Sequence, residues 1–362
     1  MSRQSYTRRQ AFERLGGLVP PVAYAQTNAE GAASGAAQVQ VAPAEELVSV
    51  YEFGVEAQRV MTPALYGIVT DGDRGMHDRI TLRPRVMVNG EGLDLSAELF
   101  GEKLFAPIMI GAVSDQAQFH RDGELETVRG ASAGRAAMVV SSHSTHPIDH
   151  IAAEAKTPLW YQVYADDNVR ETRAQIEAAV QAGSKAVVIT TGAAYQTPAN
   201  GSRGTVRMPA RSARTDWRAI DQLRDGVKVP ILIKGVMSPE DAETAVTRGV
   251  QGIVVSNFGG LLGGSPSGAI EMLPGIVDAV NRRVPVLVDG GFRRGTDVLK
   301  AIALGASAVM LGRPIMWALS AYGAPGIQVL LEHYQWDLAR AMAMTNPTIA
   351  GLDRTYVTIH RA

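Results

Sequence analysis

The sequence has no cysteine among its 362 residues, and this absence removes several classes of chemistry. Without a thiol there is no disulfide, no thiolate nucleophile and no zinc site with sulfur ligands. An excess of charge is also lacking, because 35 basic and 36 acidic residues leave a formal net charge of −1. This balance gives no reason to expect a nucleic-acid partner. No uninterrupted apolar run approaches about 18 residues, so no membrane span is expected.

The first 45 residues differ in composition from the rest of the chain. Residues 1–25 carry Arg8 and Arg9, then a short apolar run, then Ala-Tyr-Ala before Gln26. This pattern is similar to a twin-arginine export signal, which would place the protein in the periplasm or outside the cell. The alternative is a disordered basic N-terminus on a cytoplasmic protein. Residues 26–45, rich in Ala, Gly and Gln, are typical of a linker, which leaves 46–362 as the folded domain.

From residue 106 onward, short apolar runs alternate with longer amphipathic segments. The runs are continuously apolar and rich in β-branched residues, as expected for parallel strands that are buried on both faces. Eight strand–helix units predict an α/β fold, a (β/α)8 barrel with an N-terminal extension, in preference to a doubly wound sheet. The ligand-binding side chains should then lie where the strands end. The expected strands are 107–112, 137–142, 158–164, 185–191, 230–235, 252–257, 285–290 and 307–312.

The segment that follows the seventh and eighth expected strands indicates a phosphate site. Gly290 and Gly291 would allow close approach of a ligand, and Arg293 and Arg313 supply guanidinium groups that suit phosphate. The helix expected to begin near Gly295 would add its positive end. In the alternative, the glycines only form tight turns and the arginines pair with surface acids. A phosphorylated ligand is the stronger interpretation, because barrels of this kind often hold phosphate here.

The same segment carries a family resemblance. DGGFRRGTDVLKAIALGA, followed by LGRP, resembles the FMN-binding signature of the FMN-dependent α-hydroxy-acid oxidases and dehydrogenases. These include the glycolate oxidase, lactate oxidase and mandelate dehydrogenase types. ITLRPRVM, HRDGE, SSHST, YQVY and LIKGV extend the resemblance over roughly residues 50–345. It implies FMN as cofactor, no resident metal, a small-molecule substrate, and oxygen, a quinone or a carrier as electron acceptor. It also implies a homo-oligomer, a tetramer in this family.

The resemblance implies an almost complete set of FMN contacts. Lys234 matches the lysine near flavin N1, where a cation stabilises the anionic reduced flavin. Arg293 and Arg313 match the phosphate ligands. The full set of expected cofactor contacts is Ala112, Val113, Ser114, Ser141, Gln162, Thr190, Lys234, Ser256, Asp289, Gly290, Gly291, Arg293, Gly312 and Arg313.

The substrate side departs from the family pattern. In the loop SNFGGLLGG, Phe258 stands where the family has its catalytic histidine, and Leu261 where it has a carboxylate-binding arginine. Gly192 replaces the carboxylate that orients this histidine, and Ile68 replaces a substrate-contacting tyrosine. Of this set only Tyr164 is retained. The expected substrate pocket is therefore apolar, and desolvation of an unpaired carboxylate there would be costly.

A different residue could supply the base. His143 follows the second expected strand, where the family usually has an aromatic side chain close to the substrate. A histidine at this position can exchange protons near neutral pH. In the alternative it only stacks in place of that aromatic ring. The predicted catalytic residues are His143, Tyr164 and Lys234.

Three functions therefore compete. The first is an FMN oxidoreductase that transfers hydride from an altered donor, which could still be an ordinary 2-hydroxy acid if another base operates. The second is a flavin-binding protein without turnover. The third is non-redox chemistry such as that of type 2 isopentenyl diphosphate isomerases, which is disfavoured because the pocket offers few basic groups. Lys234 and Tyr164 favour the first, since a cation near N1 serves the reduced flavin.

Overall fold

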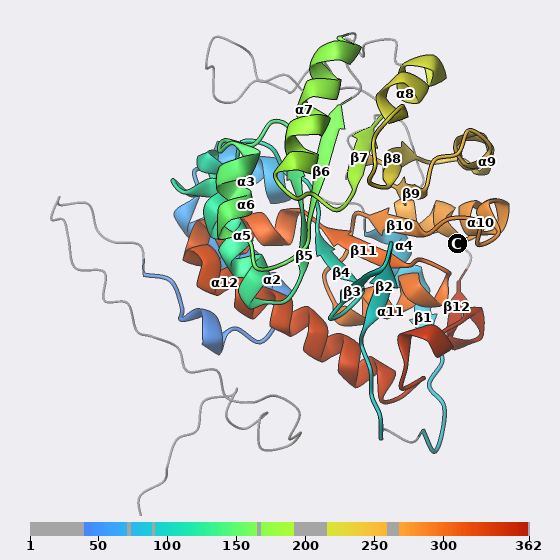
Figure 1. Ribbon diagram of the computed structural model, residues 1–362. Helices are drawn as coiled ribbons and strands as arrows, with labels where there is room; N and C mark the ends of the chain where they lie inside the picture. Colours follow the sequence, from blue (N-terminus) through green and yellow to red (C-terminus); the bar gives the residue numbers. More distant parts are fainter. Residues whose placement is uncertain are drawn as a thin grey trace, which may run out of the picture.

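The computed structural model describes residues 40–70, 74–88, 91–164, 168–191, 216–258 and 268–360. The expected export signal in residues 1–25 lies outside the described residues. At the centre, eight parallel strands close into a barrel in the order β10-β11-β4-β5-β6-β7-β8-β9 (Figure 1). The predicted (β/α)8 barrel is therefore confirmed. The strands are β4 (Ile108–Ile110), β5 (Ala137–Ser141), β6 (Leu159–Tyr164), β7 (Val187–Thr190), β8 (Ile231–Val236), β9 (Gly252–Val255), β10 (Val286–Asp289) and β11 (Ala308–Leu311).

Each barrel strand is followed by a helix, as the alternation in the sequence predicts. Ser238 caps one of these helices, because its Oγ accepts a hydrogen bond from the Asp241 amide at 3.1 Å. The helices form a ring around the strands (Figure 1). They are α5 (Gly123–Ala133), α6 (Ile148–Glu154), α7 (Val169–Gln181), α8 (Trp217–Arg224), α9 (Pro239–Thr247), α10 (Ala269–Val280), α11 (Gly295–Ala303) and α12 (Arg313–Met342).

The hydrophobic core has two parts. One part lies between the strands and the helices, and the other fills the barrel interior with side chains such as Met109, Trp160 and Leu287. A hairpin of β2 (Ala97–Leu99) and β3 (Glu102–Leu104) contributes Leu99 and Leu104 to the interior cluster. These contacts close one end of the barrel, and the site described below lies at the other end.

The chain before the barrel packs on the long final helix. A short 3-10 turn, η1 (Ala44–Glu46), precedes α2 (Val50–Val60) and α3 (Pro63–Thr70), and these segments contact α12. The packed region begins before the expected domain boundary at residue 46, because Ala44 is buried and the Tyr322 hydroxyl donates to the Ala42 carbonyl at 2.8 Å. The linker therefore ends earlier than the sequence suggests.

The remaining elements are short. The helix α4 (Gly75–Arg79) leads into β1 (Ile80–Leu82), which pairs antiparallel with β12 (Val357–Ile359). The 3-10 turns η2 (Gln116–Gln118), η4 (Ile349–Gly351) and η5 (Arg354–Tyr356) complete the described elements. Within the described ranges, no helix combines the length and apolar character that a membrane crossing requires.

Candidate active site

The carboxyl ends of the barrel strands bring most of the predicted site residues together. One group spans the ends of neighbouring strands and forms a chain of hydrogen bonds. Ser114 Oγ lies 3.1 Å from Ser141 Oγ, which donates to Gln162 Oε1 at 3.2 Å. Gln162 Nε2 in turn donates to Thr190 Oγ1 at 2.9 Å. Because these contacts fix the amide of Gln162, its polar atoms are held at one edge of the barrel mouth.

A second group is centred on Lys234. Its Nζ lies 2.8 Å from Asp289 Oδ2 and donates to Ser256 Oγ at 2.9 Å. The local sequence explains its direction, because the register between β8 and β9 shifts between Lys234 and Val236. Gly235 lies within this bulge with φ 109°, a conformation that favours glycine. The bulge directly follows Lys234, which is buried, with 8% of the residue exposed.

Phe258 completes this second group. It lies just beyond β9, its amide donates to Ser256 Oγ at 3.2 Å, and Lys234 Nζ is 4.9 Å from the centre of its ring. A cation at this distance is attracted to the face of an aromatic ring. An apolar ring therefore covers the ammonium at the position where the resemblance expects a histidine.

His143 and Tyr164 form a stacked pair. Their ring centroids are 5.0 Å apart with an interplanar angle of 27°. The His143 amide donates to Ser141 Oγ at 3.1 Å, which ties this loop to the end of β5, while the His143 side chain is exposed. The stacking predicted as the alternative role of His143 is observed, and it leaves the imidazole accessible to a substrate.

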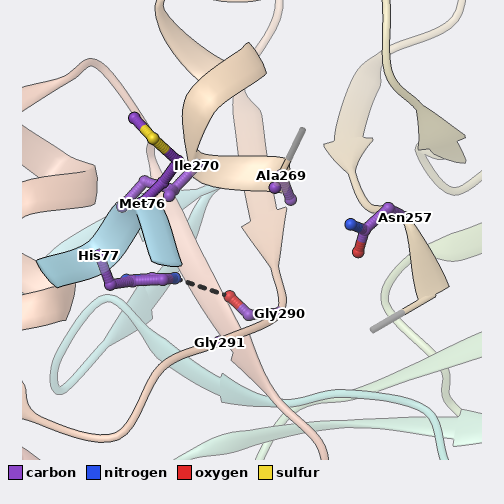
Figure 2. Close-up of a pocket in the computed structure, with 8 residues that line it drawn as sticks. Met76, His77, Asn257, Ala269, Ile270, Gly290 and Gly291 are labelled. Carbon is purple, nitrogen blue, oxygen red and sulfur yellow. Dashed lines mark hydrogen bonds between the residues drawn. The ribbon is translucent and has the colours of Figure 1, made fainter. Parts of the chain in front are cut away.

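The turn after β10 has the backbone that a bound phosphate compound would need. Gly290 and Gly291 have φ angles of 116° and 81°, which other residues rarely adopt. A Cβ built on Gly290 would meet no atom nearer than Asn257 Oδ1 at 3.9 Å. This turn lines a narrow pocket together with Asn257, Ala269 and Ile270 (Figure 2).

The helix α11 does not contribute in the expected way. The amides of Arg293 and Arg294 donate to Asp297 Oδ2 at 3.0 and 3.1 Å, and the Thr296 amide donates to Asp337 at 3.2 Å. The expectation that this helix presents its positive end to a phosphate is therefore wrong. The amino end of α12, after Gly312, has no side-chain cap.

The arginines nevertheless provide strong positive charge. Arg293 is 5% exposed, donates to the Phe292 carbonyl, and lies 4.7 Å from the centre of the Trp317 ring. Burial lowers its pKa, and the nearby Arg313 and Arg74 lower it further. Among the described residues, no carboxylate forms a salt bridge with Arg293. Because a buried guanidinium without a carboxylate partner is costly, the surroundings of Arg293 suit an anion such as the phosphate of FMN.

The donor set as a whole fits FMN. The edge of the flavin ring carries both donors and acceptors, which Gln162 and Thr190 could bind. The Lys234 ammonium, paired with Asp289, lies at the same end of the barrel, and the surroundings of Arg293 suit the phosphate. Ala112 and Val113 follow β4 and are half-buried. Ile68, which was expected to line the substrate pocket, lies on α3, and this helix packs against α2 and α12. Ile68 is 39% exposed. Leu261 and Gly192 lie outside the described residues.

Sequence reasoning missed three residues beside the phosphate turn. Arg74 and His77 contact the carbonyls of Gly291 and Gly290, and Asp297 binds the amides that follow. Asp297 could have been found from its place in RRGTD. Arg74 and His77 carry no sequence signal, because more than 200 positions separate them from the turn.

Comparisons with known proteins agree with this site. The family model for FMN-dependent dehydrogenases matches residues 67–198 and 193–358. The peroxisomal (S)-2-hydroxyacid oxidase GLO4 of Arabidopsis thaliana is 34% identical over 86% of this chain and 97% of its own length. The 2-hydroxyacid oxidase 1 of Mus musculus is 32% identical, over 86% and 96%. The crystal structure of mandelate oxidase with (S)-2-phenylpropionate superposes with a TM-score of 0.80 at 31% identity, over 87% of this chain and 100% of that one.

Proposed function

The chain belongs to the FMN-dependent dehydrogenase family, and on that premise we propose that it oxidises a 2-hydroxy-acid derivative without a free carboxylate, such as an ester or amide. FMN is the cofactor of this family. When bound, it supplies the acceptor for the hydride that the donor loses. The residues of this chain would then bind the donor, exclude water and take up its proton.

Phe258 is the observation that carries the proposal. Its ring lies at the end of β9, over the Lys234 ammonium, in the place where the resemblance expects a base. Lys234 is already paired with Asp289 at 2.8 Å. A donor carboxylate here would meet an apolar ring and a neutralised cation, and its desolvation would not be compensated. A donor without this charge avoids that penalty.

A relative supports the choice of an uncharged donor. A mandelate oxidase variant with leucine in place of an arginine has been solved with 2-hydroxy-phenylacetamide, and it superposes on this chain with a TM-score of 0.80. That compound is an amide and carries no carboxylate. Leu261 stands in this chain where the resemblance expects one of two carboxylate-binding arginines. The two cases are alike in that leucine stands in place of an arginine.

His143 takes the role of the base in this proposal. Its imidazole is exposed, stacks on Tyr164, and lies two residues beyond the end of β5. An imidazole is suited to accept the proton that leaves the donor hydroxyl at neutral pH. Stacking on the Tyr164 ring restricts the orientation of the imidazole.

An anaerobic stopped-flow screen tests the proposal. Purified yellow holoenzyme is mixed with matched donors, for example lactate, lactamide and methyl lactate, and with mandelate and its amide, while flavin absorbance is followed. We expect bleaching by the amides or esters and not by the acids. Readmission of oxygen or addition of a quinone then names the acceptor. Bleaching by lactate or mandelate alone would overturn the proposed donor class. No bleaching by any donor, with normal reaction to dithionite, would favour a flavin-binding protein without turnover.

A further inference from the structure

The carbonyls of the phosphate turn, residues 290–293, are held by side chains from an unexpected part of the chain. His77 Nε2 lies 3.1 Å from the Gly290 carbonyl oxygen, and Figure 2 shows the imidazole pointing at it across the pocket. Since a carbonyl can only accept, Nε2 carries the proton. Arg74 Nη1 donates to the Gly291 carbonyl at 2.6 Å. Both residues belong to the segment at α4, 213 and 217 positions away from their partners.

Asp297 connects the α4 segment to the phosphate turn. It is fully buried, accepts from Arg74 Nη1 at 3.0 Å, and accepts from the amides of Arg293 and Arg294. Lys300 Nζ lies 3.6 Å from the other oxygen and donates to the His77 carbonyl at 2.8 Å. The α4 segment is thus fixed to α11 from both sides.

The geometry of the turn explains why such support is needed. Gly290 and Gly291 lie beyond the last pair of the β10 ladder and have positive φ angles, so the sheet does not fix their orientation. Glycine also loses more conformational freedom on ordering than any other residue. The hydrogen bonds from His77 and Arg74 occupy the carbonyl side of the turn. The opposite side of the turn stays open toward the space beside Asn257, where a Cβ on Gly290 would lie 3.9 Å from its nearest neighbour.

We propose that Arg74 and His77 are positioning residues for FMN, which hold the 290–293 turn in the conformation that receives the cofactor. Neither needs to touch FMN. The edge-on contact between the His77 and Phe292 rings, with centroids 4.8 Å apart, fixes the imidazole for this purpose. This role concerns retention of FMN and does not depend on which donor the site oxidises. Either proposal can therefore be refuted while the other stands.

The test measures FMN release from holoenzyme on dilution, by the fluorescence of free flavin, and the melting midpoint in saturating FMN. His77→Phe keeps the ring but removes the donor, while His77→Gln retains an N–H near the Nε2 position. We expect His77→Phe to raise the dissociation constant of FMN about tenfold, as loss of one buried hydrogen bond implies, and His77→Gln to recover most of the affinity. Equal weakening by both variants, or none, would overturn the proposal.

Arg74 provides the second arm. Arg74→Met should weaken FMN at least as much as His77→Phe, and Arg74→Lys should be intermediate, because it keeps the charge but not the fork of donors. The matched control is Arg129→Met, which breaks ion pairs with Glu126 and Glu154 away from the turn and should leave FMN release unchanged. If His77→Phe does not fold, Arg74→Lys decides: wild-type affinity in that variant would refute the inference.

Discussion

At the residue scale, Phe258 combines two unusual properties. It has a positive φ of 55°, which is costly for a bulky side chain, and its ring lies over the Lys234 ammonium. Residues in such conformations persist where their surroundings hold them, and they are frequent at functional sites. The Ser256 hydroxyl, which accepts from the Phe258 amide, is one such constraint. The backbone of this position is thus preset, and in the proposed function its side chain selects the donor.

This arrangement predicts that restoring the family residue will not restore the family reaction. In Phe258→His, the new imidazole would lie beside the Lys234 ammonium, which disfavours its protonated form. Adding Leu261→Arg supplies one cation but no group to orient the imidazole, since Gly192 has no side chain. We expect no oxidation of lactate or glycolate by the double variant in the anaerobic assay. Measurable turnover of either acid would contradict this.

The stacked pair gives a second prediction at this scale. His143→Phe preserves the stack on Tyr164 but removes the proton acceptor, so flavin reduction by the best donor should slow by about 100-fold or more. Tyr164→Phe preserves both the stack and the imidazole, so its reduction rate measures the contribution of the phenolic hydroxyl separately. Stopped-flow reduction rates and FMN affinity are measured for both. A His143→Phe enzyme as fast as the wild type would leave the imidazole with a stacking role only.

Sequence reasoning reached one part of the site and not the other. Ser141, Gln162, Thr190 and Lys234 could be placed because each ends an apolar run, and parallel strands bring such ends together. His77 could not, because nothing in DGDRGMHDR shows that this segment crosses to a turn over 200 positions later. Local patterns predict position along a strand, whereas contacts between distant segments depend on packing.

At the element scale, α12 shows a limit of periodicity. The helix α12 is 30 residues long, but it is interrupted at Gly323, where φ is 63° and ψ is −147°. Two amphipathic segments in succession resemble one long helix in sequence. Similarly, the sequence shows where α11 begins but not that Asp297 and Asp337 bind its first amides.

The interruption at Gly323 can be tested with a paired substitution. In Gly323→Ala the new Cβ would lie 2.6 Å from Glu126 Oε2, and the backbone would have to keep a positive φ. We expect a loss of about 1–3 kcal/mol in the free energy of unfolding. Gly67→Ala is the control, because its Cβ meets nothing within 4 Å in α3, and it should be neutral or stabilising by up to about 1 kcal/mol. Urea unfolding measures both, and equal effects would contradict the strain at Gly323.

At the scale of the whole molecule, the near-neutral net charge conceals an uneven distribution. The formal charge is −1 over the chain, yet Arg74 and Lys300 lie beside the fully buried carboxylate of Asp297, and Arg74 also lies near Arg293 and Arg313. Composition alone therefore gives no reason to expect that the chain attracts anions, whereas the fold collects cations at one site. This concentration is what makes cofactor binding and stability sensitive to the same few residues.

The burial of His77 predicts that the free energy of unfolding depends on pH. Burial lowers the pKa of His77 below its usual value of 6.5. The Asp297 carboxylate opposes this shift, whereas Arg74 and Lys300 lower the pKa further. Between the folded pKa and 6.5, the unfolded chain binds a proton that the folded chain does not, so the free energy of unfolding falls as pH decreases through this window. Above 6.5 the contribution is constant. Asp297, whose pKa is lowered from 3.8, acts only in more acidic solution.

We therefore expect urea unfolding midpoints to be constant above about pH 7 and to fall below pH 6.5, with a slope from this one group of up to about 1.4 kcal/mol per pH unit. His77→Phe has no such proton, so its stability should fall less steeply over the same interval, even though it is less stable at pH 7. The comparison removes the contribution of the other histidines, which both proteins share. Parallel pH profiles for the two proteins would contradict this prediction. They would show that the pKa of His77 is the same in the folded and unfolded states, so that burial beside the phosphate turn does not disfavour the charged imidazole.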